Sequence, residues 1–104
     1  MADVQDNATA KRFELMLDGY LAWSSYVRSG RVVDIQHTLV PPEARGKGMA
    51  SILIQGSLDL IRARGEKVIP TCPFVYAYMS KHKETQDLLT EPGWLEQHPL
   101  QRTP

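Results

Sequence analysis

A few side chains in this sequence have types and spacings that suit chemistry, and the densest group lies in the stretch VPPEARGKGMAS. Arg45, Gly46, Lys47 and Gly48 stand there directly before an apolar run that is typical of a helix. Glycines leave backbone N–H groups free to surround an anion, and the N-terminus of a following helix adds partial positive charge. The spacing therefore fits either a phosphate-binding loop or a plain turn into a helix.

Cys72 and His37 are the two further candidates. Cys72 directly precedes Pro73, which can begin a helix, and at such a position the helix dipole favours a thiolate. The thiol is thus a candidate nucleophile or proton donor, although a free cysteine is also commonly a small buried side chain. His37 is a candidate general base or a structural hydrogen-bonding residue. One cysteine and three scattered histidines give no metal-ligand spacing, so we expect no metal.

The elements that must position these residues follow from hydrophobic periodicity. Phe13, Leu15 and Leu17 alternate with polar neighbours and predict a strand, which Asp18-Gly19 connects to a second strand at about 20–27. A third strand is predicted over 31–40. These three strands should form an antiparallel meander.

A βαβ unit is expected to follow the meander. Apolar residues recur every three or four positions over 48–64 and predict a helix, EKVIPTC predicts a fourth strand, and 73–82 predicts a second helix. The third and fourth strands should then be parallel, with a right-handed crossover. Ligands bind beyond the carboxyl ends of such strands, so His37, the glycine loop and Cys72 should meet at one edge of the sheet.

The composition of the chain bounds its class. With 104 residues it should form one domain, at 12–90, between a flexible N-terminus at 1–11 and an irregular tail at 91–104. Twelve Lys and Arg balance twelve Asp and Glu, which disfavours nucleic acid or an anionic membrane as a partner. No membrane span or signal peptide is recognisable, and a single cysteine suits a reducing compartment. We therefore expect a cytoplasmic monomer or weak homodimer.

Two nucleotide-binding motifs match the loop poorly. The P-loop GxxxxGK[ST] requires a glycine five residues before Gly46 and a hydroxyl residue where Gly48 stands. The dinucleotide fingerprint GxGxxG requires a third glycine where Ser51 stands, and an acidic residue after the next strand, which ends in Thr71-Cys72. Neither motif explains the loop.

A third pattern matches. The run Arg45-Gly46-Lys47-Gly48-Met49-Ala50 fits [R/Q]-x-x-G-x-[G/A], the pyrophosphate-binding signature of the GNAT acetyltransferase superfamily, which the chain resembles. It is most similar to a small stand-alone branch of that superfamily, which shares His37-Thr38 before the loop, RGxGxA within it and Pro70-Thr71-Cys72-Pro73-Phe74-Val75 after it. The resemblance covers roughly residues 12–89.

This resemblance implies a compact minimal GNAT-like α/β fold and an acetyl-CoA-dependent N-acetyltransferase acting on an unidentified amine, a small molecule or a protein. Backbone amides of residues 46–50 would hold the pyrophosphate, and the pantetheine arm would pair with the nearby strand. The acetyl group would lie between His37 and Cys72 as catalytic residues. The implied cofactor-binding residues are Leu39, Val40, Arg45, Gly46, Lys47, Gly48, Met49 and Ala50.

Two alternatives stay open. The first is a CoA-binding or protein-interaction module without turnover. It is favoured because no final strands are expected to wall an acceptor pocket, and because Met79, rather than Tyr76 or Tyr78, stands closest to the register of the superfamily's general-acid tyrosine. The second is covalent acceptance of the acetyl group by Cys72.

Overall fold

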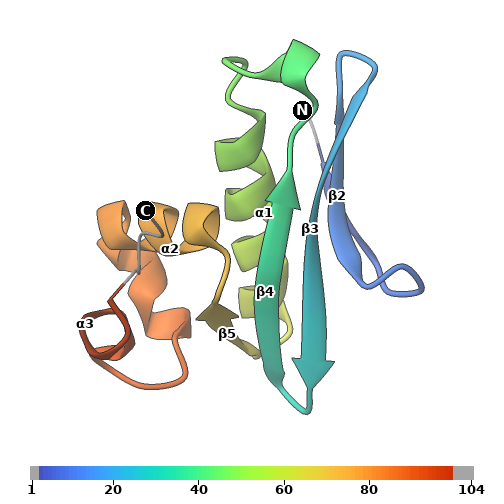
Figure 1. Cartoon of the computed structure of the whole chain (residues 1–104). Helices are drawn as coiled ribbons and strands as arrows, with labels where there is room; N and C mark the ends of the chain where they lie inside the picture. The colour runs from blue at the N-terminus through green and yellow to red at the C-terminus, as the bar shows by residue number, and fades with distance from the viewer. Residues whose placement is uncertain (1–2, 100–104) are drawn as a thin grey trace.

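The computed structural model describes residues 3–99, which form a five-stranded sheet with its strands side by side in chain order (Figure 1). Antiparallel pairing joins the first four strands, and the fifth pairs parallel to the fourth. The predicted meander and βαβ unit are both confirmed. The strands are β1 Val4–Asn7, β2 Arg12–Leu17, β3 Tyr20–Ser29, β4 Val32–Leu39 and β5 Lys67–Pro70.

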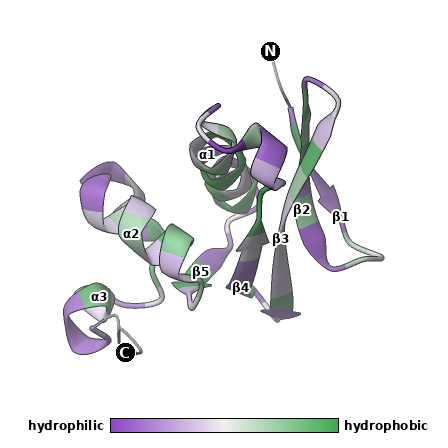
Figure 2. Cartoon of the chain, turned by 45° about the horizontal axis from the view of Figure 1, so that its top comes forward, coloured by the Kyte–Doolittle hydropathy of each residue, from purple (hydrophilic) through white to green (hydrophobic). Residues whose placement is uncertain are grey.

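The helices lie on one face and at one edge of the sheet. In Figures 1 and 2, α1 lies against the sheet, whereas α2 lies beyond the β5 edge. The long helix α1 takes this place because its apolar stripe must be buried against the strands. The helical segments are η1 Pro42–Ala44, α1 Met49–Ala63, α2 Pro73–Lys81, η2 Lys83–Leu88 and α3 Trp94–Gln97.

One hydrophobic core lies between the sheet and the helices. Alternate residues of each strand point toward α1, which explains why Phe13 and Leu15 are fully buried while Met16 is exposed. The other buried apolar side chains are Ala22, Tyr26, Val33, Ile35, Ala44, Met49, Leu53, Ile54, Leu58, Ile61, Val68, Cys72, Val75, Met79, Leu88, Leu89 and Leu95.

The structure corrects the prediction for the N-terminal segment. Residues 4–7, expected to be flexible, form the edge strand β1, which pairs with β2 from Val4↔Leu15 to Asn7↔Arg12. Val4 lies against Gly56 of α1, where an added Cβ would come within 2.7 Å of the Val4 Cβ. A four-residue strand with one apolar residue shows too little alternation to be predicted. In the tail predicted to be irregular, residues 94–97 form the short helix α3.

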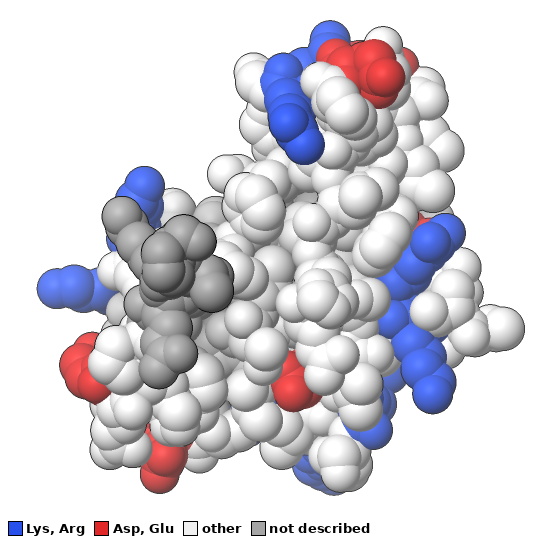
Figure 3. Space-filling model, viewed as in Figure 1, with Lys and Arg blue, Asp and Glu red and all other residues white. Residues whose placement is uncertain are grey.

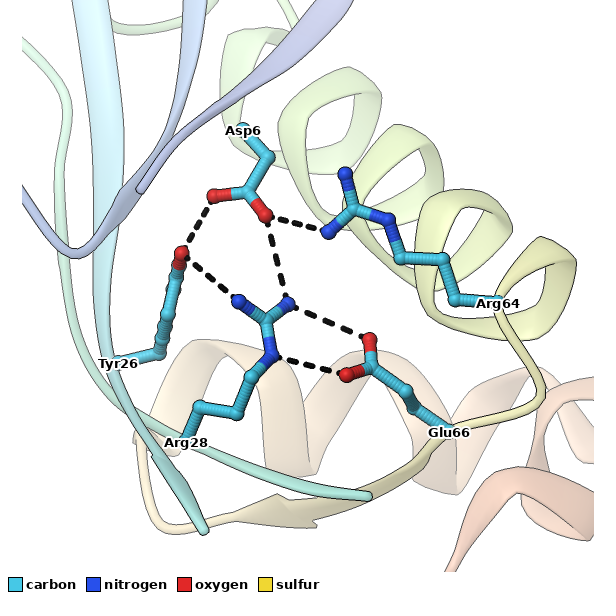
Figure 4. Close-up of polar contacts among 5 residues, drawn as sticks. All are labelled: Asp6, Tyr26, Arg28, Arg64 and Glu66. Carbon is cyan, nitrogen blue, oxygen red and sulfur yellow. Dashed lines mark hydrogen bonds and ion pairs between the residues drawn. The ribbon is translucent and has the colours of Figure 1, made fainter. Parts of the chain in front are cut away.

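A polar cluster of Asp6, Tyr26, Arg28, Arg64 and Glu66 ties β1, β3 and the end of α1 together (Figure 4). Asp6 accepts hydrogen bonds from Tyr26, Arg28 and Arg64, while Arg28 donates to both Glu66 oxygens at 2.8 and 3.2 Å. Burial alone would raise the pKa of Asp6, but hydrogen bonds from Tyr26 and Arg64 and the charge of Arg28 outweigh it and lower this pKa. The cluster therefore holds Asp6 as a carboxylate.

Between residues 3 and 99, no helix is long and apolar enough to cross a membrane. Within the same range, no three His, Cys, Asp or Glu side chains are grouped to hold a metal ion.

Candidate active site

The edge of β4 becomes free of a strand partner where the glycine loop approaches. Pairing between β4 and β5 ends at Ile35↔Pro70, and the Cys72 N–H then donates to the Ile35 carbonyl at 2.8 Å. Pairing of β4 with β3 continues to Leu39. Beyond Ile35, this edge of β4 pairs with no strand in the described part of the chain, so its backbone groups are available to a ligand.

A cavity of 440 Å³ lies beside this open edge. Figure 3 shows a recess beneath the projecting end of the molecule, with basic side chains at its upper rim and uncharged atoms below. The volume of the cavity and its mainly apolar walls are typical of a small-molecule site. The lining residues are Thr38, Leu39, Val40, Ala44, Arg45, Gly46, Gly48, Met49, Ala50, Ser51 and Phe74.

The start of α1 presents unsatisfied backbone donors to the cavity. Gly46 and Gly48 have φ angles of 88° and 74°, which suit glycine, and Gly48 is the N-cap. This N-cap provides no side-chain hydrogen bond, and the first helical bond is from Ile52 N–H to the Gly48 carbonyl. The N–H groups of residues 49–51 thus have no acceptor within the helix. A Cβ added at either glycine would meet nothing within 4 Å, so a ligand can approach the backbone closely.

Two exposed cations flank these donors. Arg45 ends η1 in an extended conformation, and Lys47 follows between the two glycines. The Lys47 ammonium lies 3.9 Å from Asp18 across exposed surface, a separation at which water weakens the ion pair. Both cations can therefore turn toward an anionic ligand at the helix N-terminus.

Cys72 lies beneath the cavity wall at the N-cap of α2. It is 1% exposed, and its Sγ lies 3.2 Å from Thr38 Oγ1. Thr38 itself lines the cavity and lies 2.7 Å from Ser24 Oγ. Sequence reasoning recognised Thr38 only as part of a motif and missed Ser24. The polar pair Ser24 and Thr38 on neighbouring strands could have indicated the site, but the two residues can be paired only once the β3–β4 register is known.

His37 lies on the opposite face of β4 from Cys72. Ser25 pairs with His37 but Tyr26 pairs with Ile35, so Gln36 is the extra residue of a β-bulge. The bulge shifts the alternation by one, so that Thr38 follows Ile35 on the face toward α1 and His37 is exposed on the other face. The predicted site residues thus meet at one edge of the sheet, but His37 and Cys72 do not share a face.

The tyrosines of α2 are occupied elsewhere, and neither lines the cavity. The Tyr76 hydroxyl donates to the Leu95 carbonyl at 2.6 Å, and the Tyr78 hydroxyl donates to Gln55. Burial, together with two nearby carboxylates, raises the pKa of Tyr78. Met79, the residue closest to the register of an acid tyrosine, is fully buried.

Comparisons with known proteins agree with this architecture. Protein NATD1 of Gallus gallus and that of Mus musculus are each 36% identical to the chain over 58 residues, which is 56% of this chain and 53% of each relative. Protein NATD1 of Homo sapiens is 36% identical over 58 residues, 51% of its own length. The match thus spans about half the length of these relatives. Residues 12–88 match the family described as GCN5-related N-acetyl-transferase, and the chain belongs to that family.

Proposed function

We propose that this protein is an acetyl-CoA-dependent N-acetyltransferase whose co-substrate occupies the cavity between the open edge of β4 and the start of α1. One observation carries the proposal: a single cavity is lined at one end by an uncapped helix N-terminus and at the other by an unpaired strand edge. CoA needs both features, because it joins an anionic pyrophosphate to an arm with two amide groups.

The residues present suit this co-substrate. The N–H groups at the start of α1 would bind the pyrophosphate, with Arg45 and Lys47 adding charge. The backbone of Leu39 and Val40 would pair with the pantetheine amides, since both residues line the cavity beyond the point where β5 departs. Phe74, 58% exposed at the cavity, would cover the apolar part of the arm.

Each candidate catalytic residue has a role that matches the side of β4 on which it lies. When bound, acetyl-CoA supplies a thioester carbonyl that an amine can attack. His37, on the exposed face, would remove a proton from the acceptor amine, because amines are protonated near neutral pH. Cys72, on the cavity face and connected to the cavity by Thr38, would return a proton to the sulfur of CoA. The acetyl group would lie between them at the strand edge.

The motifs that suggest the small stand-alone branch of the superfamily surround this one cavity. Thr38 of the His37-Thr38 pair, Gly48 of the loop and Phe74 beyond Cys72 all line it. Three motifs separated in sequence therefore contribute to one site, which supports assignment to that branch.

The alternative of a CoA-binding module without turnover rests on a specific observation, because Tyr76 and Tyr78 donate their hydroxyl groups away from the cavity. Covalent acceptance of the acetyl group by Cys72 is less favoured, since the side chain is 1% exposed and Thr38 separates it from the cavity.

Thiol release and intact mass, measured together, distinguish these functions. Acetyl-CoA is mixed with the protein alone and then with a panel of primary amines and amine-bearing peptides. The proposal expects thiol release that depends on an added amine, with no change in the protein's mass. Binding without release for every amine would support the module, and a gain of one acetyl group that is absent in Cys72→Ser would support the covalent acceptor.

A further inference from the structure

Two hydroxyl groups and a thiol are hydrogen-bonded in a row beside the candidate active site. Ser24 Oγ lies 2.7 Å from Thr38 Oγ1, which lies 3.2 Å from Cys72 Sγ. Ser24 and Cys72 are both 1% exposed, whereas Thr38 is half-buried and lines the cavity. The thiol therefore contacts a residue that lines the cavity.

This chain can run in either direction, because a hydroxyl both donates and accepts hydrogen bonds. With a protonated thiol, the Cys72 S–H donates to Thr38, whose O–H donates to Ser24. With a thiolate, Ser24 donates to Thr38, and Thr38 donates to the sulfur. A buried polar group without a partner is costly, and a buried charge is more so. Reversal keeps the sulfur paired in both protonation states.

The β-bulge at Gln36 creates this arrangement. Without the bulge, regular alternation after Ile35 would point His37 toward α1 and Thr38 toward solvent. Ser24 faces α1 between the apolar Ala22 and Tyr26, a position at which a hydroxyl needs a partner. The extra residue in β4 brings Thr38 opposite Ser24 and next to the sulfur.

We propose that Thr38 is a positioning residue for Cys72 and forms a relay between the thiol and the cavity, and that Ser24 holds the Thr38 hydroxyl from the interior side. The inference rests on the proposed function, in which CoA leaves as a thiolate. For this step the Thr38 O–H rotates from Ser24 toward the CoA sulfur. As its proton passes to that sulfur, the Cys72 S–H proton passes to Thr38 Oγ1, which leaves Cys72 as a thiolate. The proton lost by the acceptor amine to His37 returns through solvent and restores the thiol.

Titration of the thiolate by its ultraviolet absorbance tests the relay. Cys72 is the chain's only cysteine, so the signal that is absent from a Cys72→Ser blank belongs to it alone. Thr38→Val removes the hydroxyl at nearly constant shape, and Thr38→Ser retains it. Ser24→Ala removes the far end of the chain without touching the sulfur. Thr71→Val is the matched control, because the Thr71 hydroxyl bonds Asp34 instead.

Loss of a donor to the thiolate should move the titration midpoint of Thr38→Val to higher pH by about one unit. Ser24→Ala should move it in the same direction by less, and Thr38→Ser and Thr71→Val should titrate as the unmodified protein does. The proposal would be overturned if the titration midpoints of Thr38→Val and Ser24→Ala both equalled that of the unmodified protein. It would also be overturned if the midpoint of Thr38→Ser shifted as far as that of Thr38→Val. If Thr38→Val does not fold, Thr38→Ala replaces it with the same expectation.

The titration uses the protein without CoA, so it measures the relay independently of turnover. Failure of the unmodified protein to bind CoA would contradict the proposed function and leave the titration result standing. Unchanged titration midpoints in Thr38→Val and Ser24→Ala would contradict the relay alone. CoA binding and thiol release would still test the proposed function.

Discussion

At the scale of single residues, the cations of the loop and the two candidate catalytic side chains occupy separate parts of the site. Arg45 and Lys47 are exposed at the loop before α1, so they can be replaced without disturbing the core. Cys72 is buried, but serine nearly retains its size and its hydrogen bonding. Each role can therefore be tested by a variant that is expected to fold.

Arg45→Ala and Lys47→Ala should each weaken CoA binding about three- to tenfold, because each removes a charge that assists the pyrophosphate. Titration calorimetry measures the affinity. Arg31→Ala and Lys81→Ala are the matched controls, since both residues are exposed and lie outside the loop, before β4 and at the end of α2. Equal losses in the controls would indicate a general charge effect rather than a site at the loop.

Cys72→Ser should keep the fold and CoA binding but lower amine-dependent thiol release by about a hundredfold or more, because a serine hydroxyl is a much poorer acid. His37→Gln should also lower release without affecting the melting temperature, since the side chain is exposed. CoA-release kinetics on both variants provide the measurement. Undiminished release in Cys72→Ser would remove the thiol from the mechanism and leave His37 as the remaining candidate.

Sequence reasoning predicted which residues would meet at this edge of the sheet but not the faces on which they lie. The βαβ pattern was sufficient to bring the glycine loop and Cys72 to one edge, because parallel strands fix which ends meet. It could not place His37, because a bulge at Gln36 changes the direction of every later side chain and leaves no mark in the hydrophobic pattern. The contact between Thr38 and Cys72 was hidden for the same reason.

At the scale of elements, the contact between β1 and α1 depends on one glycine. A glycine within a helix costs stability relative to alanine, so Gly56 needs a structural reason. That reason is the close approach of Val4, which leaves no room for a Cβ. The strand was missed from sequence because its four residues are mostly polar, and the glycine in the middle of α1 was the signal that could have revealed it.

Gly56→Ala should therefore lower the free energy of unfolding by about 1–3 kcal/mol, because the overlap with Val4 outweighs the gain in helix propensity. Chemical denaturation measures this change. The double variant Gly56→Ala/Val4→Gly should lose less than the sum of the two single variants, since the clash is gone. Stabilisation by Gly56→Ala alone would show that β1 does not pack against the helix in this way.

At the scale of the whole molecule, the site and the polar cluster lie at different ends of the sheet. The cavity adjoins the end of β4 and the start of α1, whereas the Asp6–Arg28–Glu66 cluster joins the end of β3 to the segment after α1 (Figures 1 and 4). Stability and binding can therefore be altered separately.

Asp6 should make the free energy of unfolding depend on pH in the acid range. Its folded pKa is lowered from the ordinary value of 3.8, so its contribution is present above that value and is lost as pH falls through the lower, folded pKa. Asp6→Asn should cost about 2 kcal/mol near neutral pH, and the difference from the unmodified protein should shrink below pH 3.8. Chemical denaturation of both proteins, near neutral pH and below pH 3.8, measures this difference in the free energy of unfolding. The control is Asp87→Asn, which changes an exposed ion pair with Arg62 and should cost less than about 0.5 kcal/mol. If Asp87→Asn lowered the free energy of unfolding as much as Asp6→Asn, a special role for Asp6 would be contradicted.

The central claim is that CoA binds where the open edge of β4 meets the start of α1, and amide NMR shifts on addition of CoA test it most directly. The account predicts the largest changes at the backbone N–H groups of Val40, Gly46, Gly48 and Ala50, with little change at Gly65 at the opposite end of α1. Unchanged amides at the loop under saturating CoA, or changes concentrated away from the cavity, would contradict it.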